Sequence, residues 1–169
     1  MRGQVACSVL PVATASAVLH QSVSYVDGDI TTQGYPYESD CYYTVGSDPS
    51  GGSFYNLQVE VYCGPKEPAT WQANNGSSTE AFPDSPISGA RLMPYGTDPD
   101  GAAAIAQAPG NILLSVEDVG AGASGTLGAD KIDTGIEPLL ATLLSKVYAS
   151  AVNQHACEQV MADAKKQSQ

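Results

Sequence analysis

Alternation between hydrophobic and polar positions is clearest in residues 54–63, FYNLQVEVYC. The apolar side chains of this segment share one side of the predicted strand: Tyr55, Leu57, Val59, Val61 and Cys63. The polar side chains share the other side: Asn56, Gln58 and Glu60. Strict alternation is typical of an antiparallel sheet with one buried face and one solvated face. We therefore predict that Cys63 ends this strand on the core side and that the opposite side is wet.

Five further segments have the composition and flanking turn residues of strands: residues 22–27, 39–45, 88–96, 102–110 and 111–119. The first is predicted to end at the Asp27-Gly28 turn, and residues 29–37 are predicted to form a loop. The sequence TDPDG between the third and fourth segments predicts that these two form a hairpin. Residues 46–53 and the glycine-rich residues 120–130 are predicted to be surface loops.

Apolar residues recur at helical spacing toward the C-terminus and form one stripe: Ile136, Leu140, Leu143, Val147 and Ala151. Asp133 or Thr134 can cap this helix, which is predicted to continue until Met161 rejoins the stripe. Residues 9–20 predict a shorter helix with Pro11 in its first turn. These elements predict a single α+β domain over residues 1–169. We expect an antiparallel sheet of five or six strands packed against a short N-terminal helix and a long C-terminal helix, with two disulfides.

The charge balance of the chain is strongly acidic. Seven Lys and Arg residues face eighteen Asp and Glu residues, which gives a formal net charge of -11. Such a surface repels phosphate backbones and anionic lipid, so we expect no binding to nucleic acid. The apolar runs are shorter than the roughly 20 residues that a membrane-spanning helix needs, so we expect no membrane-spanning segment.

Widely spaced cysteines in even number predict two disulfides and therefore an oxidising compartment. The chain has four of them: Cys7, Cys41, Cys63 and Cys157. Neither His20 nor His155 stands at zinc-site spacing from a cysteine pair, so we expect no metal site here. Three disulfide pairings are possible, and we favour Cys63 with Cys157 and Cys7 with Cys41. In this pairing the end of a core-facing strand meets the flank of the C-terminal helix.

Sequence motifs for catalysis are absent. Ser124 lies in a Gly-rich segment but lacks the G-x-S-x-G frame of a nucleophile elbow, and cysteines that pair leave no activated thiol. Three pairs of acids can offer oxygen ligands to Ca²⁺, although they are also ordinary turn residues: Asp27 and Asp29, Asp98 and Asp100, and Glu117 and Asp118. We therefore predict no catalytic residue, no bound metal and no cofactor.

Tyrosine is the most suggestive residue type, with nine Tyr against two Phe. Tyr suits half-exposed sheet positions by β propensity alone. It also forms amphipathic surfaces on which a glycan, a lipid or a protein partner can lie. The candidate binding surface comprises six aromatic residues: Tyr25, Tyr35, Tyr37, Tyr42, Tyr62 and Trp71. Trp71 can equally cover an edge of the core.

The layout of the chain resembles a group of secreted actinobacterial cell-envelope lipoproteins of uncharacterised function. The resemblance is carried by the segments ACSVLPVATASAVLHQSV and CYYTV, at Cys7, Val9, Leu10, Ala15, Ala17, Val18, Leu19, Cys41 and Tyr43. The layout is also similar to the extracellular sensor domain of mycobacterial Ser/Thr kinases, which has two disulfides and a cleft beneath its helices. The resemblance implies a protein that is secreted or anchored on the outer side of the cytoplasmic membrane, and a ligand-binding role. It implies no catalytic residue.

These observations favour a non-enzymatic binding or sensing domain of the bacterial cell envelope. The expected partner is a small apolar or glycan ligand, or an envelope protein. It would lie in the cleft between the terminal helix and the sheet, or on the Tyr-rich edge. The alternatives are a protein-interaction module or surface antigen without a small-molecule site, and a small secreted hydrolase. A closed apolar cavity favours the first hypothesis, a flat Tyr patch the second, and a His bonded to Ser and Asp the third.

Overall fold

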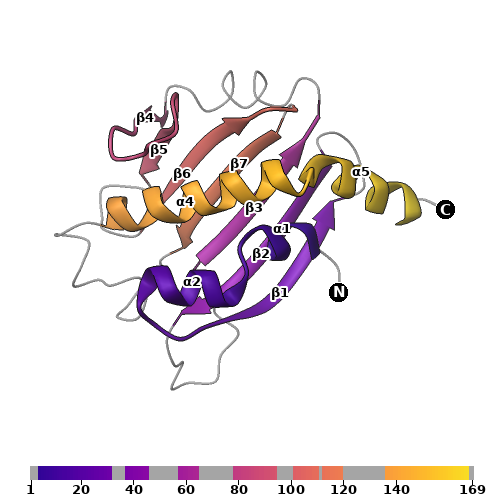
Figure 1. The fold of residues 1–169 in the computed structure, drawn as a ribbon, viewed down its shortest axis with the longest axis horizontal. Helices are drawn as coiled ribbons and strands as arrows, with labels where there is room; N and C mark the ends of the chain where they lie inside the picture. The colour runs from indigo at the N-terminus through magenta and orange to yellow at the C-terminus, as the bar shows by residue number, and fades with distance from the viewer. Residues whose placement is uncertain are drawn as a thin grey trace.

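The computed structural model describes residues 4–31, 37–45, 57–64, 78–94, 101–110, 112–119 and 136–167. Within these ranges, seven strands form one antiparallel sheet in the order β1-β2-β3-β7-β6-β5-β4 (Figure 1). They are β1 (Val23–Thr31), β2 (Tyr37–Val45), β3 (Leu57–Cys63), β4 (Glu80–Ala81), β5 (Arg91–Pro94), β6 (Gly101–Ala108) and β7 (Ile112–Val119). The six predicted strands are present, together with the two-residue β4. The predicted loops at residues 46–53 and 120–130 lie outside the described residues.

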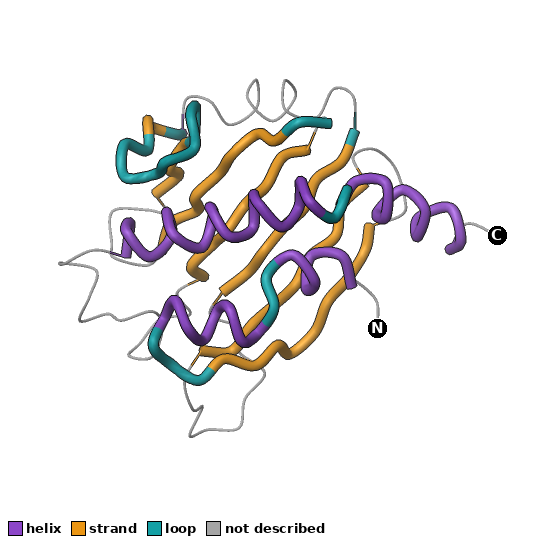
Figure 2. Tube along the Cα trace, viewed as in Figure 1, coloured by secondary structure: helices purple, strands orange, loops and turns teal. Residues whose placement is uncertain are grey.

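The helices of the described chain all cover the same face of this sheet (Figures 1 and 2). They are α1 (Gln4–Val9), α2 (Val12–Leu19), α4 (Ile136–Asn153) and α5 (Ala156–Gln167). Helix α4 packs on β6 and β7, α1 on β2, and α5 on β3. The predicted α+β architecture, with helices from both ends of the chain on one antiparallel sheet, is confirmed. Of the helices described, none combines the length and the apolar character needed to cross a membrane.

The main core fills the layer between the sheet and the helices. The helix-facing side chains of β3 are all buried: Leu57, Val59, Val61 and Cys63. From the other side, the predicted stripe on α4 is buried as well: Leu140, Leu143, Val147 and Ala151. Both buried sides were predicted from the sequence. Burial of apolar surface is favourable, so the apolar residues that recur with the period of a strand or a helix identify the side that faces the core.

Two disulfides tie helices to the sheet, with the pairing that we favoured. Cys7 of α1 is bonded to Cys41 of β2, with Cα atoms 5.0 Å apart. Cys157 of α5 is bonded to Cys63 at the end of β3, with Cα atoms 5.4 Å apart. Both separations are normal for disulfides. Two such bridges fit a protein of an oxidising, extracellular environment.

The helix predicted over residues 9–20 is present as α2, but its predicted start is wrong and α1 was not predicted, because the chain leaves the helical conformation between α1 and α2. Pro11 has an extended backbone (φ -58°, ψ 143°) and precedes the first residue of α2. Its carbonyl accepts the N–H groups of Thr14 (2.9 Å) and Ala15 (3.0 Å). Proline has no N–H with which to continue α1, and it disfavours a helical conformation at Leu10. Pro11 therefore separates two helices instead of lying in the first turn of one.

The predicted turn at Asp27-Gly28 is also wrong. Strand β1 continues to Thr31, and Gly28 lies opposite Cys41 within the ladder to β2. The register shifts between Tyr25 and Asp27, which marks a β-bulge. The predicted turn residues thus lie directly after a local irregularity, while pairing with β2 keeps this segment, including residues 29–31, in the sheet.

The predicted long C-terminal helix is divided into α4 and α5. His155 has a left-handed backbone conformation (φ 51°), which a right-handed helix cannot include. The break shifts the helical phase, so Met161 is 40% exposed and does not rejoin the apolar stripe. Val160 and Ala164 take the buried positions of α5 instead. The predicted caps Asp133 and Thr134 lie outside the described residues.

The sheet face opposite the helices is not the wet surface that alternation predicted. Glu60 is only 8% exposed and Ser115 is 3% exposed. A second apolar cluster is buried on this face: Ala103, Ile105 and Leu113. The middle of the sheet is therefore buried on both sides, and the polar side chains there need hydrogen-bond partners.

Candidate functional site

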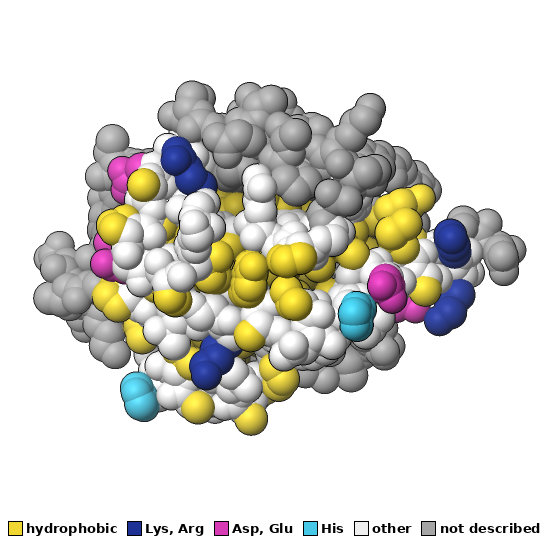
Figure 3. Space-filling view, turned by 45° about the horizontal axis from the view of Figure 1, so that its top comes forward, with side chains coloured by type: hydrophobic (Ala, Val, Ile, Leu, Met, Phe, Trp, Pro, Cys, Tyr) yellow, Lys and Arg dark blue, Asp and Glu magenta, His cyan; other side chains and the backbone are white. Residues whose placement is uncertain are grey.

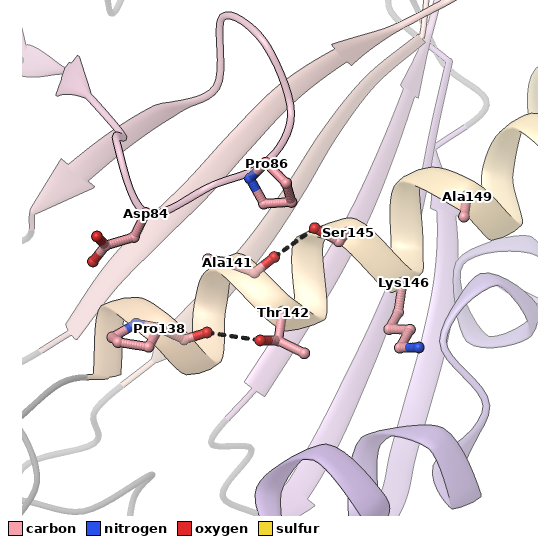
Figure 4. A pocket seen from close by; sticks show the side chains of 8 residues that line it. All are labelled: Asp84, Pro86, Pro138, Ala141, Thr142, Ser145, Lys146 and Ala149. Atoms are coloured by element: carbon pink, nitrogen blue, oxygen red, sulfur yellow. Dashed lines mark hydrogen bonds between the residues drawn. The ribbon is translucent and has the colours of Figure 1, made fainter.

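A groove of about 620 Å³ lies between α4 and the segment that joins β4 to β5 (Figure 4). One wall consists of residues of α4: Pro138, Ala141, Thr142, Ser145, Lys146 and Ala149. Asp84 and Pro86 form the other wall. The groove is open to solvent, so it is not the closed apolar cavity that would most clearly favour a binding domain. On the molecular face seen in Figure 3, hydrophobic side chains gather over the centre and charged ones are scattered around them.

The helical wall follows from the spacing of small and polar residues along α4. Residues 138, 141, 142, 145 and 149 recur at intervals of three or four and therefore share one side of the helix. The adjacent side carries fully buried leucines: Leu140, Leu143 and Leu144. Because these leucines anchor α4 on the sheet, the groove wall is held in a fixed position.

The opposite wall is a turn whose backbone is hydrogen-bonded to itself. The N–H of Phe82 donates to the carbonyl of Ala90 (3.1 Å), and the N–H of Ser85 donates to the carbonyl of Phe82 (3.2 Å). The Phe82 side chain is buried, and Gly89 supplies a left-handed position (φ 77°) that favours glycine. Asp84 is exposed on this fixed turn. Both walls are therefore largely formed before any ligand binds.

The groove presents hydrogen-bond acceptors and two opposite charges among apolar side chains. Thr142 Oγ1 donates to the carbonyl of Pro138, and Ser145 Oγ donates to the carbonyl of Ala141, each at 2.9 Å (Figure 4). Each hydroxyl oxygen keeps lone pairs for a donor on a ligand. Lys146 adds an exposed cation to the same wall. A complementary ligand is small, with an apolar face and polar hydrogens.

A second polar arrangement lies on the sheet face opposite the helices, where Asp40 of β2 is paired directly with Glu60 of β3. Each of the two residues is 8% exposed. Glu38 brings a third carboxyl, and one oxygen of each group lies within 4.8 Å of the others. Antiparallel pairing imposes this proximity, because the Cβ atoms of directly opposed residues are about 4.5–5.5 Å apart.

Hydrogen bonds hold the two buried carboxyls in place. Tyr42 Oη donates to Asp40 Oδ2 (3.3 Å), and Gln58 Nε2 donates to Glu60 Oε1 (3.0 Å). Each donor is two residues away on the same strand, so it lies on the same side of the sheet as the carboxyl that it bonds. The carboxyls are thus part of an ordered polar network within an otherwise apolar layer.

Burial dominates the electrostatics of this network. It raises the pKa of Glu60 to about 9, with the charge of Glu117 as the next cause. Burial likewise raises the pKa of Tyr62. One cation could reach oxygens of Glu38, Asp40 and Glu60, but a carboxyl must lose its proton before it binds a metal. We therefore do not assign these residues as metal ligands.

The structure places the predicted aromatic residues on different parts of the sheet. Tyr42 and Tyr62 are half-buried on the face with the carboxyls, in register positions on either side of the Asp40–Glu60 pair. Tyr37 packs against the main core on the helix-covered face. Tyr25 belongs to β1, but its side chain lies outside the described part of the molecule, as do Tyr35 and Trp71. A continuous aromatic binding surface stays a prediction.

The ligand cleft was predicted between the terminal helix and the sheet, whereas the groove lies between α4 and the turn that carries Asp84, and the acidic arrangement was not predicted. Only strand register brings Asp40 beside Glu60, and the register of distant strands is not written in a local pattern. A usable signal did exist, because Asp40 and Glu60 each stand on the polar side of a predicted strand. For the groove, the signal was the run of small and hydroxyl residues beside the apolar stripe of α4.

Neither histidine forms a catalytic arrangement within the described ranges. His20 is exposed at the end of α2. His155 Nδ1 lies 3.7 Å from Glu158 Oε1 in a pair of exposed side chains. A Ser–His–acid triad requires a histidine that bonds both the nucleophile and the acid. The described residues therefore give the hydrolase alternative no support.

Comparison with known protein families, with curated proteins and with solved structures finds no match to this chain. The likeness to secreted actinobacterial lipoproteins and to kinase sensor domains stays a prediction. Function must therefore be inferred from the groove, the buried carboxyls and the disulfides themselves.

Proposed function

We propose that this protein is a non-enzymatic binding domain of the bacterial cell envelope and that it holds a small ligand in the groove along α4. The observation that carries this proposal is the groove itself, about 620 Å³ between a helix and a turn that are both anchored in the core. Ligand sites in proteins typically have volumes of roughly 300–1,000 Å³ and are largely formed before binding.

Anchoring of both walls matters for affinity. The α4 wall is backed by the buried Leu140 and Leu143, and the turn wall is fixed by the buried Phe82. Binding to preformed walls avoids the cost of ordering side chains, which is roughly 0.5–1.5 kcal/mol for each flexible side chain immobilised. A modest number of contacts can then give useful affinity.

The chemistry of the groove favours an amphiphilic ligand such as a glycan fragment. Pro86 and Ala149 offer apolar surface to a sugar ring from the two opposite walls. The oxygens of Thr142 and Ser145 can accept hydrogen bonds from ligand hydroxyls, since their own hydrogens are donated to the helix backbone. The exposed carboxylate of Asp84 is a further acceptor.

An extracytoplasmic location is supported by the two disulfides, which persist in oxidising compartments and are rare in the reducing cytosol. The net charge of -11 agrees with a soluble surface that does not attract anionic lipid or nucleic acid. Anchoring on the outer side of the cytoplasmic membrane is part of the proposal because of the layout shared with envelope lipoproteins.

Native mass spectrometry of protein purified from a cell-envelope extract tests this proposal. The variant Ala149→Trp fills the groove from an exposed helical position, and Ala162→Trp places the same side chain at an exposed position of α5, outside the groove. We expect the wild-type protein and Ala162→Trp to retain a ligand of the same added mass, and Ala149→Trp to lose it.

Two results would contradict the groove assignment: a wild-type spectrum without added mass, or an added mass that Ala149→Trp retains. Circular dichroism spectra of the two variants should match that of the wild type, which excludes unfolding as the cause of ligand loss. The second of these results would favour binding on another surface, as in the protein-interaction alternative.

A further inference from the structure

We propose that Glu60 is a proton-holding residue: the folded sheet keeps its carboxyl neutral and uses the proton to bond Glu117, so that the pairing of β2, β3 and β7 depends on pH. This inference concerns the sheet face opposite the helices. It is independent of the groove and of the function proposed for it.

Strand register places Glu60 in the middle of the sheet. It lies opposite Asp40 on β2 and opposite Ser115 on β7. Asp40, Glu60 and Ser115 are 8%, 8% and 3% exposed, so water has little access to the row. Two carboxylates that are close together and poorly solvated cannot both be ionised without a large penalty.

Within the described residues, the charged groups that act on Glu60 are all acidic. Asp40 faces it from β2, Glu117 on β7 lies opposite the neighbouring Gln58, and both acids disfavour the ionised form of Glu60. Glu38 on β2 completes the group of neighbouring carboxyls. On β3 itself the neighbours on this face are Gln58 and Tyr62, and the hydrogen bond from Tyr62 to Glu60 partly opposes the rise in the pKa of Glu60. Among the described residues no cation acts on Glu60, and we take a bound proton to be what neutralises it.

The hydrogen bonds indicate where the proton lies. Gln58 Nε2 donates to Glu60 Oε1 (3.0 Å), and Tyr62 also bonds the Glu60 carboxyl. Glu117 is within hydrogen-bonding reach of Glu60, and its Oε1 accepts the hydroxyl of Ser115 (3.1 Å). In the proposed arrangement the protonated carboxyl of Glu60 is the donor and a Glu117 oxygen is the acceptor. Loss of this proton would replace a hydrogen bond between β3 and β7 by repulsion between two carboxylates.

The direction of the pH effect follows from the raised pKa of Glu60, about 9 in the folded chain against 4.5 as the ordinary value. Between these two values the unfolded chain releases the proton and the folded chain keeps it. The contribution of Glu60 to the free energy of unfolding is therefore greatest at and below pH 4.5. It falls as the pH rises and levels off above about 9. The folded sheet is therefore more stable in mild acid and less stable in alkaline conditions.

Urea denaturation between pH 5.5 and 8.5 tests the inference. Glu60→Gln keeps the shape and a hydrogen-bond donor but cannot ionise, and Glu80→Gln is the control because Glu80 is exposed on β4. For the wild type and the control, we expect the unfolding constant to rise by up to about tenfold per pH unit relative to Glu60→Gln. Equal pH slopes in all three proteins would overturn the proposal.

Carboxyl ¹³C NMR titration of the wild-type protein gives a second readout that does not depend on a variant folding. We expect one Glu side chain to titrate near pH 9, and this signal to be missing from Glu60→Gln. The proposal is overturned if every Glu of the folded protein titrates below pH 6. It is also overturned if added Ca²⁺ stabilises the wild type but not Glu60→Gln, since a cation would then take the place of the proton.

Discussion

Removal of the Cys63–Cys157 disulfide should be the most damaging small change to this fold. The bridge joins the end of β3 to α5 across a sequence separation of 94 residues, while Cys7–Cys41 spans 34 residues. In the chain-entropy relation the longer loop corresponds to about 4.7 kcal/mol of stabilisation and the shorter loop to about 3.8 kcal/mol. Total stabilities of domains are only about 5–15 kcal/mol, so each loss is a large fraction of the whole.

The double variants Cys63→Ala/Cys157→Ala and Cys7→Ala/Cys41→Ala provide the comparison, with free energies of unfolding from urea denaturation. We expect losses of about 5 and about 4 kcal/mol, respectively. At roughly 2–4 °C per kcal/mol for a chain of this size, the first variant should melt about 10–20 °C below the wild type. The m-value should rise in both variants, because an unfolded chain without the bridge exposes more surface.

A loss below about 1 kcal/mol for Cys63→Ala/Cys157→Ala would refute the entropic reasoning for this bridge. A consistently larger loss for Cys7→Ala/Cys41→Ala would show that local packing around α1, not loop length, sets the contribution of these disulfides. Reduction of the wild type with dithiothreitol should lower its stability by at least as much as either double variant, which checks the result without any substitution.

Two further predictions concern single residues of the α1–α2 region. Tyr43 Oη donates to the buried carbonyl of Leu10 (2.7 Å). Tyr43→Phe should therefore lower the free energy of unfolding by about 1–3 kcal/mol. An unchanged urea midpoint would contradict this prediction. His20 ends α2 with a left-handed backbone (φ 52°). His20→Gly should therefore raise the melting temperature slightly, because it relieves roughly 0.5–1 kcal/mol of backbone strain. The control variant Ala17→Gly, at an exposed position of α2, should lower the melting temperature.

Local patterns were sufficient for the type of most elements. Leu57, Val59 and Val61 alternate with polar residues, and Leu140, Leu143 and Val147 recur at helical spacing, so the spacing alone identifies their buried sides. The favoured disulfide pairing rested on the same patterns, because Cys63 was predicted to end a strand on the core side and Cys157 to lie on the flank of the C-terminal helix. In each case the physical cause is periodicity, which depends only on neighbours along the chain.

Boundaries were predicted less well, because they depend on what a segment contacts. Gly28 is a turn residue by its local preference, yet it remains in β1 because β2 lies alongside and supplies hydrogen-bond partners. The break at His155 had no signal such as Gly or Pro, and Met161 was consequently assigned to the wrong side of the helix. Pro11 was a real local signal whose effect on Leu10 was underestimated.

Sequence alone determined the α+β class, the acidic charge and the buried sides of the clearest elements, and it favoured the disulfide pairing that the structure has. Tertiary structure alone decided that Glu60 is buried beside Asp40 and that α4 forms a groove with the turn carrying Asp84. The difference has a physical reason. Periodicity reports how one element divides apolar from polar surface, whereas strand register and the meeting of α4 with a distant turn depend on contacts between segments far apart in the chain.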